Sequence, residues 1–248
     1  PRIRTGFLDS ARPRPVLRDE QQVVVDALRG VAGSSSTSND RRSSTDQPGS
    51  ADRPWLLQGV TGSGKTEVYL QWIESLLAQD DAAQVLVLVP EIGLTPSLHR
   101  QLRDRFSQLP VALLHSAMTD SERATHWLAA ASGRARIVLG TRLAALTPIP
   151  RLAAIVIDEE HDASFKQQEG IRYSARDLAV ARAAREQIPI LLGSATPSLE
   201  SWRNARLGRY RLMRLATRAT GAPIPQIETL SLRDGQTRHG LTERAIRA

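Results

Sequence analysis

Cysteine is absent from the 248 residues of the chain, so neither a disulfide nor a cysteine–zinc site can form. Long apolar runs are absent as well, because no run approaches the length of a membrane span and no signal-peptide pattern opens the chain. These absences favour a cytoplasmic protein without a membrane partner. The chain begins at Pro1 instead of Met, which we expect of a fragment or a processed product.

Lysine is scarce in a chain that is otherwise basic. The formal net charge is +7, which favours an anionic partner, yet only Lys65 and Lys166 of the 33 basic residues are lysines. An arginine preference of the genome explains the bias. The two remaining lysines therefore mark positions where a compact ammonium serves better than a planar guanidinium.

The distribution of residue types divides the chain into three parts. Residues 1–14 are rich in arginine and proline and are expected to be a linker from missing upstream domains. Residues 15–220 are expected to form one domain, interrupted by a polar, low-complexity loop at 33–53 that we expect to be disordered. Residues 221–248 break the pattern with two prolines and are expected to begin a connection to a missing second domain.

Within 15–220, short apolar runs alternate with amphipathic segments, which predicts an α/β domain with a mainly parallel sheet flanked by helices. Strands are expected at Trp55–Leu57, Val85–Val89, Val111–Leu114, Ile137–Leu139, Ala154–Ile157 and Ile190–Leu192. Helices are expected at Asp19–Arg29, with Val23, Val24, Ala27 and Leu28 as its apolar side, and at Glu67–Leu77, with Val68, Trp72, Ile73 and Leu76 on one face. A further helix carries Leu98, Leu102 and Phe106.

Three sequence pairs resemble helix N-termini. Thr119 and Glu122 have the spacing of a capping box. Thr95-Pro96 and Thr196-Pro197 each place a capping hydroxyl before a proline that suits the first helical position.

The segment GVTGSGKT is a complete phosphate-binding loop of the form G-x-x-x-x-G-K-[ST]. It lies between an expected strand and an expected helix, so that backbone N–H groups and the helix N-terminus face a phosphate. Lys65 is expected to reach the β- and γ-phosphates of ATP, and the Thr66 hydroxyl to ligate Mg²⁺. The residues expected to bind nucleotide are Gly59, Val60, Thr61, Gly62, Ser63, Gly64, Lys65 and Thr66.

An acidic cluster follows the strand AAIVID. A carboxylate at a strand end beside a phosphate loop can hold Mg²⁺, and its neighbour can act as general base toward water. We assign Asp158 to the metal and Glu159 to the water. The alternative is an acidic N-cap cluster that leads into a helix.

Hydroxyl groups lie at the end of a second strand, ILLGS. Ser194 and Thr196 could hydrogen-bond His161 and relay the state of the nucleotide. Alternatively, Thr196 only caps a helix and His161 is an ordinary polar residue at a helix start.

Six segments together resemble the first RecA-like lobe of a superfamily 2 DNA helicase, and most closely the family of primosomal replication-restart DNA helicases. They are GVTGSGKTEVY, VLVPEIGLTPSL, LGTRLAAL, IDEEHD, KQQEGIRYSARDLAV and LGSATPSLES, and the match covers about residues 15–215. The resemblance implies ATP-driven, 3′-to-5′ unwinding of DNA at stalled forks and loading of the replicative helicase. Implied partners are single-stranded and forked DNA, single-stranded DNA-binding protein and primosome loading factors.

The resemblance also assigns residues. Lys65, Asp158, Glu159 and His161 match catalytic motifs, and Ser194 and Thr196 match a coupling motif. Residues implied to touch the DNA backbone are Pro90, Glu91, Gly140, Thr141 and Arg142. Gln21 resembles a glutamine that reads adenine, since an amide offers one donor and one acceptor, although it could equally be a solvated helix residue.

Residues 162–177 resemble an aromatic-rich loop that senses single-stranded DNA. Phe165 and Tyr173 are expected to stack on bases, and Lys166, Arg172 and Arg176 to meet phosphates. Ile171 stands where a larger ring is expected. The alternative is a mobile charged loop.

Two features of the family are missing from the chain: a second arginine motif after residue 200, and the cysteine pairs of a zinc module. Zinc is therefore expected only in a missing part of the parent protein, and the chain looks like a first lobe without its second. A restriction-type translocase remains an alternative, as does a module that binds nucleotide and DNA without turnover.

Overall fold

The computed structural model describes residues 15–32, 53–91, 96–219, 237–238 and 241–242. The expected linker at 1–14 lies outside the described residues, as do 33–52 of the expected loop and most of 221–248. Thr95 also lies outside them, so the structure does not test the cap predicted there.

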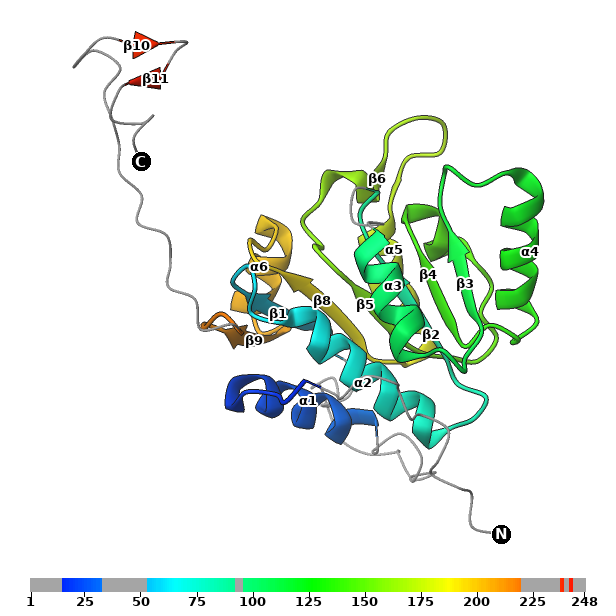
Figure 1. Cartoon of the computed structure of the whole chain (residues 1–248), viewed down its shortest axis with the longest axis horizontal. Helices are drawn as coiled ribbons and strands as arrows, with labels where there is room; N and C mark the ends of the chain where they lie inside the picture. The colour runs from blue at the N-terminus through cyan, green and yellow to red at the C-terminus, as the bar shows by residue number, and fades with distance from the viewer. Residues whose placement is uncertain (1–14, 33–52, 92–95, 220–236, 239–240, 243–248) are drawn as a thin grey trace.

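A seven-stranded parallel sheet forms the centre of the domain, with the strand order β3-β4-β2-β5-β8-β1-β9 (Figure 1). Its strands are β1 (Trp55–Gly59), β2 (Gln84–Leu88), β3 (Val111–Leu114), β4 (Ile137–Gly140), β5 (Leu152–Ile157), β8 (Ile190–Ser194) and β9 (Arg211–Leu215). Because all strands run the same way, the segments after β1, β2, β4, β5 and β8 meet at one edge of the sheet.

Helices cover both faces of the sheet. They are α1 (Asp19–Ala32), α2 (Lys65–Gln79), α3 (Pro96–Arg105), α4 (Asp120–Ala131), α5 (Ala175–Glu186) and α6 (Leu199–Arg206). Two 3₁₀ helices and two short hairpins complete the described elements: η2 (Arg142–Leu146), η3 (Ala163–Phe165), β6 (Lys166–Gln167) with β7 (Tyr173–Ser174), and β10 (Thr237–Arg238) with β11 (Leu241–Thr242). None of the helices in the described ranges has the length and apolar character needed to cross a bilayer.

Two hydrophobic clusters bury the two faces. Alternate residues of each central strand point to opposite sides, so that Val85 and Val87 pack with α1, α2 and α3, whereas Leu86 and Leu88 pack with α5 and η2. Burial on both faces explains why these strands are continuous apolar runs. The predicted α/β architecture is confirmed.

Three details differ from the sequence-based predictions. Along α1 the buried apolar side chains are Val24, Val25 and Leu28, whereas Val23 is 62% exposed. Strand β9 at the sheet edge was not predicted. Helix α6 begins after Ser198, whose hydroxyl accepts a hydrogen bond from the Ser201 N–H, so Thr196 is not its N-cap. In contrast, the capping box at Thr119 and Glu122 is present at the start of α4.

Candidate functional site

The phosphate-binding loop joins β1 to α2 and adopts a conformation that depends on glycine. Gly62 and Gly64 have φ angles of +79° and +82°, a region that side chains disfavour. A Cβ atom at Gly59 would lie 2.5 Å from Ser63 Oγ, and one at Gly64 would lie 2.3 Å from Gln21 Nε2. The glycines therefore permit a tight turn in which larger residues would be strained.

Lys65 begins α2 and is 8% exposed. Its Nζ donates to the Gly59 carbonyl at 3.0 Å and lies 3.5 Å from Glu159 Oε1. The turn of residues 158–161, which we call the acidic turn, thus meets the phosphate loop at this ammonium, although the two segments are far apart in sequence. The N–H groups of Lys65 and Thr66 have no intrahelical acceptor, because they lie in the first helical turn.

The donor atoms of the loop fit a phosphate group. Ser63 Oγ is buried and has no hydrogen-bond partner in the structure, and its neighbours are backbone N–H groups, a helix N-terminus and an ammonium. These are the groups with which proteins hold anions. Among the described residues no group of three or more metal-ligating side chains occurs. A Mg²⁺ ion at Asp158 and Thr66 would therefore need phosphate oxygens and water to complete its octahedral shell.

Asp158 directly follows β5 beside the loop, and its carboxylate accepts hydrogen bonds from two donors. Tyr69 Oη donates to Asp158 Oδ1 at 3.2 Å, and the Glu159 N–H donates to the same oxygen at 3.1 Å. Burial raises the pKa of Asp158, and the nearby charge of Glu159 raises this pKa further, whereas Lys65 and the Tyr69 hydrogen bond lower it. Burial and the charge of Asp158 also hold the pKa of Tyr69 well above its usual value.

Glu159 has a φ angle of +45°, which is uncommon for a residue other than glycine. Such left-handed residues concentrate at functional sites, where the surrounding structure holds them. The conformation places the Glu159 carboxylate between Lys65 and His161, since its Oε2 lies 3.5 Å from His161 Nδ1.

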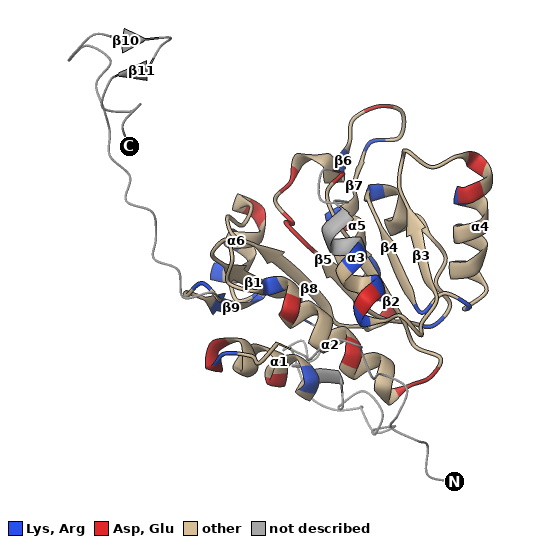
Figure 2. Cartoon of the chain, viewed as in Figure 1, with Lys and Arg blue, Asp and Glu red and all other residues tan. Residues whose placement is uncertain are grey.

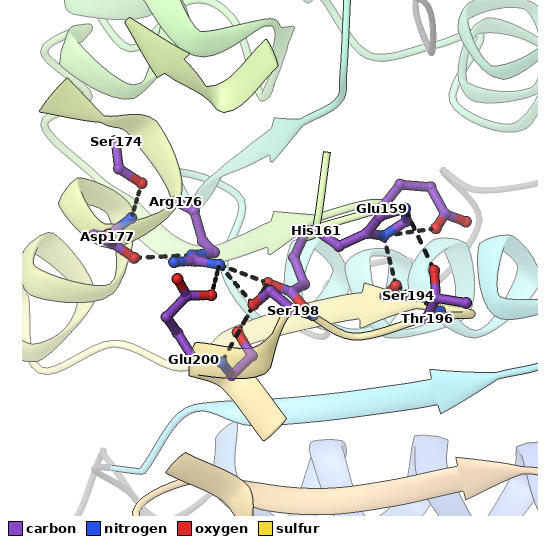
Figure 3. A network of polar contacts seen from close by, with 11 residues as sticks. Glu159, His161, Ser174, Arg176, Asp177, Ser194, Thr196, Ser198 and Glu200 are labelled. Atoms are coloured by element: carbon purple, nitrogen blue, oxygen red, sulfur yellow. Dashed lines mark hydrogen bonds and ion pairs between the residues drawn. The ribbon is translucent and has the colours of Figure 1, made fainter. Parts of the chain in front are cut away.

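His161 lies beside the hydroxyl groups at the end of β8, namely Ser194 in the strand and Thr196 just after it. Its Nδ1 lies 2.7 Å from Ser194 Oγ, and its Nε2 lies 3.5 Å from Thr196 Oγ1 (Figure 3). The Thr196 N–H donates to Ser194 Oγ at 3.0 Å, which ties the two residues together. The structure therefore brings together the three residues that the sequence suggested could interact.

Gln21 lies against the phosphate loop from the start of α1. Its Oε1 accepts from the Arg18 N–H at 2.9 Å, and its Nε2 donates to the Ser63 carbonyl at 2.8 Å. The side chain is 5% exposed, so it is not the solvated helix residue that was the alternative. One hydrogen of Nε2 and one lone pair of Oε1 remain free to pair with an adenine. The adenine-reading role of Gln21 stays a prediction.

Two residues expected to contact DNA are buried in the domain instead. Phe165 is 2% exposed and packs in the core cluster that includes α5, so its ring cannot stack on a base. Arg176 is 7% exposed and pairs with Glu160 and Asp177 at 3.2 and 2.8 Å (Figure 3). Their burial argues against both expected DNA contacts, because an aromatic or basic residue near a loop can equally face inward.

Pro90 and Thr141 are also buried, which argues against the contacts expected of their side chains with DNA. Gly140 is required for packing, since a Cβ atom there would lie 2.4 Å from the Leu114 carbonyl oxygen. At the same edge Glu91 and Arg142 remain accessible, and Arg142 Nη2 lies 3.6 Å from Glu91 Oε1. Arg142 also donates to the Ser164 carbonyl at 3.2 Å, which ties this region to η3, the 3₁₀ helix just before the hairpin of β6 and β7.

The hairpin of β6 and β7 carries the remaining candidates. Lys166, Ile171 and Arg172 are exposed, and Ile171 is 86% exposed. Tyr173 is half-buried, and its hydroxyl donates to the Arg142 carbonyl at 3.4 Å. Figure 2 shows basic residues intermixed with acidic ones on the helices, whereas the central strands β1, β2, β4, β5 and β8 carry neither. A DNA-binding role would therefore rest on individual residues such as Lys166 more than on one basic stripe.

Two further residues of the site were missed from the sequence. Tyr69 reaches Asp158 because Gly193 leaves room for its ring, as a Cβ atom at Gly193 would lie 1.6 Å from Tyr69 Oη. Glu160, between Glu159 and His161 in the sequence, is 1% exposed. Both residues belong to segments that the sequence analysis singled out, GVTGSGKTEVY and IDEEHD. No residue pattern in these segments indicates the tertiary contacts that Tyr69 and Glu160 make.

Comparison with known proteins identifies relatives. A family model described as DEAD/DEAH box helicase matches residues 45–205. Replication restart protein PriA of Haemophilus influenzae is 48% identical over 189 residues, which cover 76% of this chain and 26% of that protein. Replication restart protein PriA of Bacillus subtilis is 43% identical over 180 residues, which cover 73% of this chain and 22% of that protein. The chain thus spans about a quarter of the length of these relatives.

A solved structure supports the fold. The structure of RecG bound to a three-way DNA junction matches this chain with a TM-score of 0.54 and 24% identity. The match covers 83% of this chain and 24% of the RecG chain. At this identity the likeness concerns the fold alone. The expected helicase-lobe fold and the expected resemblance to replication-restart proteins are both confirmed.

Proposed function

Since the chain belongs to the DEAD/DEAH box helicase family, we propose that it is the ATP- and DNA-binding lobe of an ATP-dependent 3′-to-5′ DNA helicase. The similarity to replication restart proteins supports a role at stalled forks and in primosome assembly. The observation that carries the proposal is the meeting of phosphate loop and acidic turn, with Lys65 Nζ 3.5 Å from Glu159 Oε1.

In this proposal ATP binds on the loop of residues 59–66, with Lys65 against its β- and γ-phosphates. Thr66 and Asp158 hold Mg²⁺, which when bound neutralises charge that develops on the phosphates. Glu159 accepts a proton from the attacking water, and its left-handed backbone keeps the carboxylate directed at the loop. Gln21 braces the loop through the Ser63 carbonyl and offers its remaining amide positions to adenine.

His161, Ser194 and Thr196 couple this site to the rest of the enzyme. Their hydrogen bonds join the end of β5 to the end of β8, so a shift at one strand end is felt at the other. DNA is proposed to lie over the same edge of the sheet, at Glu91, Arg142, Lys166, Arg172 and Tyr173. Single-stranded and forked DNA, single-stranded DNA-binding protein and primosome loading factors are the proposed partners, in the cytoplasm. Any zinc belongs to a part of the parent protein outside this chain.

The lobe is proposed to bind ATP but to hydrolyse it barely when alone. Sites of this class need an arginine from a second element, worth about 10³–10⁵ in rate in related ATPases and GTPases. The test compares ATP hydrolysis by this chain with hydrolysis by a polypeptide that extends it through a second lobe, with and without single-stranded DNA. We expect DNA-stimulated turnover only in the longer polypeptide, lost in its Glu159→Gln variant while ATP binding is kept. Robust turnover by this chain, or parental turnover by Glu159→Gln, would refute the proposal.

A further inference from the structure

Glu160 is the most completely bonded carboxylate of the acidic turn, although no role in chemistry was assigned to it. Its side chain is 0% exposed. Oε1 accepts from the Ser198 N–H at 2.8 Å. Oε2 accepts from Arg176 Nη1 at 3.2 Å, Ser198 Oγ at 3.0 Å and Ser201 Oγ at 2.8 Å. A buried charge persists only where it is paired and hydrogen-bonded to this extent.

The donors to Glu160 come from two helices that follow different functional segments. Arg176 lies in the first turn of α5, directly after the β6–β7 hairpin, and Ser198 and Ser201 lie at the start of α6, after Ser194 and Thr196. Arg176 also donates to Ser198 Oγ at 2.7 Å and to Asp177 at 2.8 Å (Figure 3). Burial alone would lower the pKa of Arg176, but its bonds to Asp177 and Glu160 outweigh this and hold that pKa above its usual value.

The same residue also anchors the turn through its backbone. The Glu160 N–H donates to the Gly193 carbonyl at 3.0 Å, at the end of β8. The residue before it is Glu159, with its φ of +45°, and the Glu159 N–H in turn holds Asp158 Oδ1 at 3.1 Å. A left-handed residue relaxes unless its neighbours are held. Fixing Glu160 at both side chain and backbone therefore fixes Glu159 and, through its N–H, the carboxylate of Asp158.

We propose that Glu160 is a positioning residue: the clamp formed by Glu160, Arg176, Ser198 and Ser201 holds the acidic turn in the geometry that presents Asp158 to a metal-bound nucleotide. The inference rests on the proposed function, since it concerns how that site is held. It also replaces the DNA contact expected of Arg176 with an internal one. The hairpin and the acidic turn are then joined through α5.

The experiment measures the affinity of the chain for the fluorescent nucleotide mant-ATP, with Mg²⁺ and with EDTA. The ratio of the two dissociation constants reports the contribution of the metal-binding carboxylate. A general loss of folded protein scales both constants alike and leaves the ratio unchanged. Glu160→Gln keeps the shape but replaces one acceptor oxygen with a donor that faces other donors. Glu200→Gln is the matched control, because Glu200 lies 3.8 Å from the same Arg176 but is 62% exposed.

We expect Glu160→Gln to reduce the Mg²⁺-dependent gain in affinity about tenfold, as is typical when a residue behind a metal ligand is lost. The affinity in EDTA should stay parental, because the phosphate loop is untouched. Glu200→Gln should match the parent in both conditions. Ser201→Ala removes one of the bonds and should lower the ratio less, which provides the test if Glu160→Gln does not fold.

Two results would overturn the inference in different ways. Parental ratios in Glu160→Gln and Ser201→Ala, together with lowered melting temperatures, would make the clamp a structural feature only. Absence of any mant-ATP binding by the parent chain would instead refute the proposed function, on which the inference depends.

Discussion

Asp158 is a carboxylate that the fold keeps partly out of water. Its raised pKa means that the charged form is less stable in the folded chain than in the unfolded chain. Below the unfolded pKa both states are protonated and no penalty exists. As the pH rises through the folded pKa, the penalty develops fully. At neutral pH the nucleotide-free protein is therefore destabilised by the residue that we propose holds Mg²⁺.

Asp158→Asn should accordingly raise the melting temperature of the nucleotide-free chain at pH 7, because the amide oxygen can still accept from Tyr69 and from the Glu159 N–H. The gain in melting temperature over the parent should shrink as the pH falls toward and below the pKa of this carboxyl group in the unfolded chain. The same variant should lose most of the additional stabilisation that Mg²⁺ gives in the presence of ATP. Melting curves across pH 3.5–7, with and without nucleotide, measure both effects. A variant that is less stable than the parent at pH 7 without nucleotide would contradict this account.

Gly193 offers a second test at the residue scale, since it makes room for Tyr69. A Cβ atom there would lie 1.6 Å from Tyr69 Oη and 2.6 Å from Tyr69 Cζ, so the buried ring would have to shift. Gly193→Ala should therefore destabilise the chain by about 1–3 kcal/mol, the usual cost of overpacking.

Gly30 provides the matched control, because nothing lies within 4 Å of a Cβ atom placed there in helix α1. Gly30→Ala should stabilise the chain by about 0.5–1 kcal/mol through helix propensity. Denaturant unfolding of the two variants gives both numbers. Equal midpoints for Gly193→Ala and the parent would show that Tyr69 does not occupy this space.

At the scale of elements, helix α4 owes its start to the capping box of Thr119 and Glu122. The hydroxyl and N–H of Thr119 hold the pKa of Glu122 below its usual value. The stabilisation from this carboxylate is therefore present above its unfolded pKa and is lost as the pH falls through the folded pKa.

Thr119→Ala should destabilise the chain by about 1 kcal/mol at pH 7, and by less below pH 4. Ser121→Ala, at an exposed position in the first turn of the same helix, is the control and should change stability little. The measurement is the free energy of unfolding in urea for both variants and the parent, at pH 7 and at a pH below 4. A loss for Thr119→Ala that is independent of pH would show that Glu122 takes no part in the cap.

Helices and strands with a regular apolar pattern could be predicted from the sequence, whereas a strand at the edge of the sheet could not. Val68, Trp72, Ile73 and Leu76 repeat at helical spacing and are all buried in α2, as expected. Strand β9 contains two arginines and can tolerate them because it lies at the sheet edge and pairs only with β1. One of them, Arg211, lies over the ring of Trp55 at 4.8 Å. An edge strand needs no continuous apolar run, so hydrophobicity did not reveal it.

The site was predictable where chemistry demands a fixed residue order. The phosphate loop must contain Gly62, Gly64 and Lys65 at set positions, whereas Tyr69 and Glu160 act through tertiary contacts that no spacing encodes. Phe165 illustrates the opposite error, since its place in a loop suggested exposure but its ring completes the core.

At the scale of the whole molecule, the proposal places DNA over the edge of the sheet where the strands end. Lys166 lies exposed on the hairpin at that edge. Lys166→Ala should weaken binding of a single-stranded oligonucleotide and flatten its salt dependence by about 0.7 in log–log slope, since one phosphate contact is lost. Arg134 is the control, because it precedes β4 and so lies toward the opposite edge. Fluorescence anisotropy at several salt concentrations checks the slope. Equal slopes for Lys166→Ala and the parent would refute a phosphate contact.

The central claim is that this chain binds ATP with Mg²⁺ through Lys65. Calorimetric titration of ATP with Mg²⁺ into the parent, Lys65→Ala and Lys166→Ala tests it most directly, because the two variants remove the only lysines of the chain one at a time. The account predicts saturable binding with one nucleotide per chain for the parent and Lys166→Ala. It predicts no measurable binding for Lys65→Ala, because this variant removes the ammonium that begins α2 beside the loop. Binding by Lys65→Ala with the affinity of the parent would contradict the account.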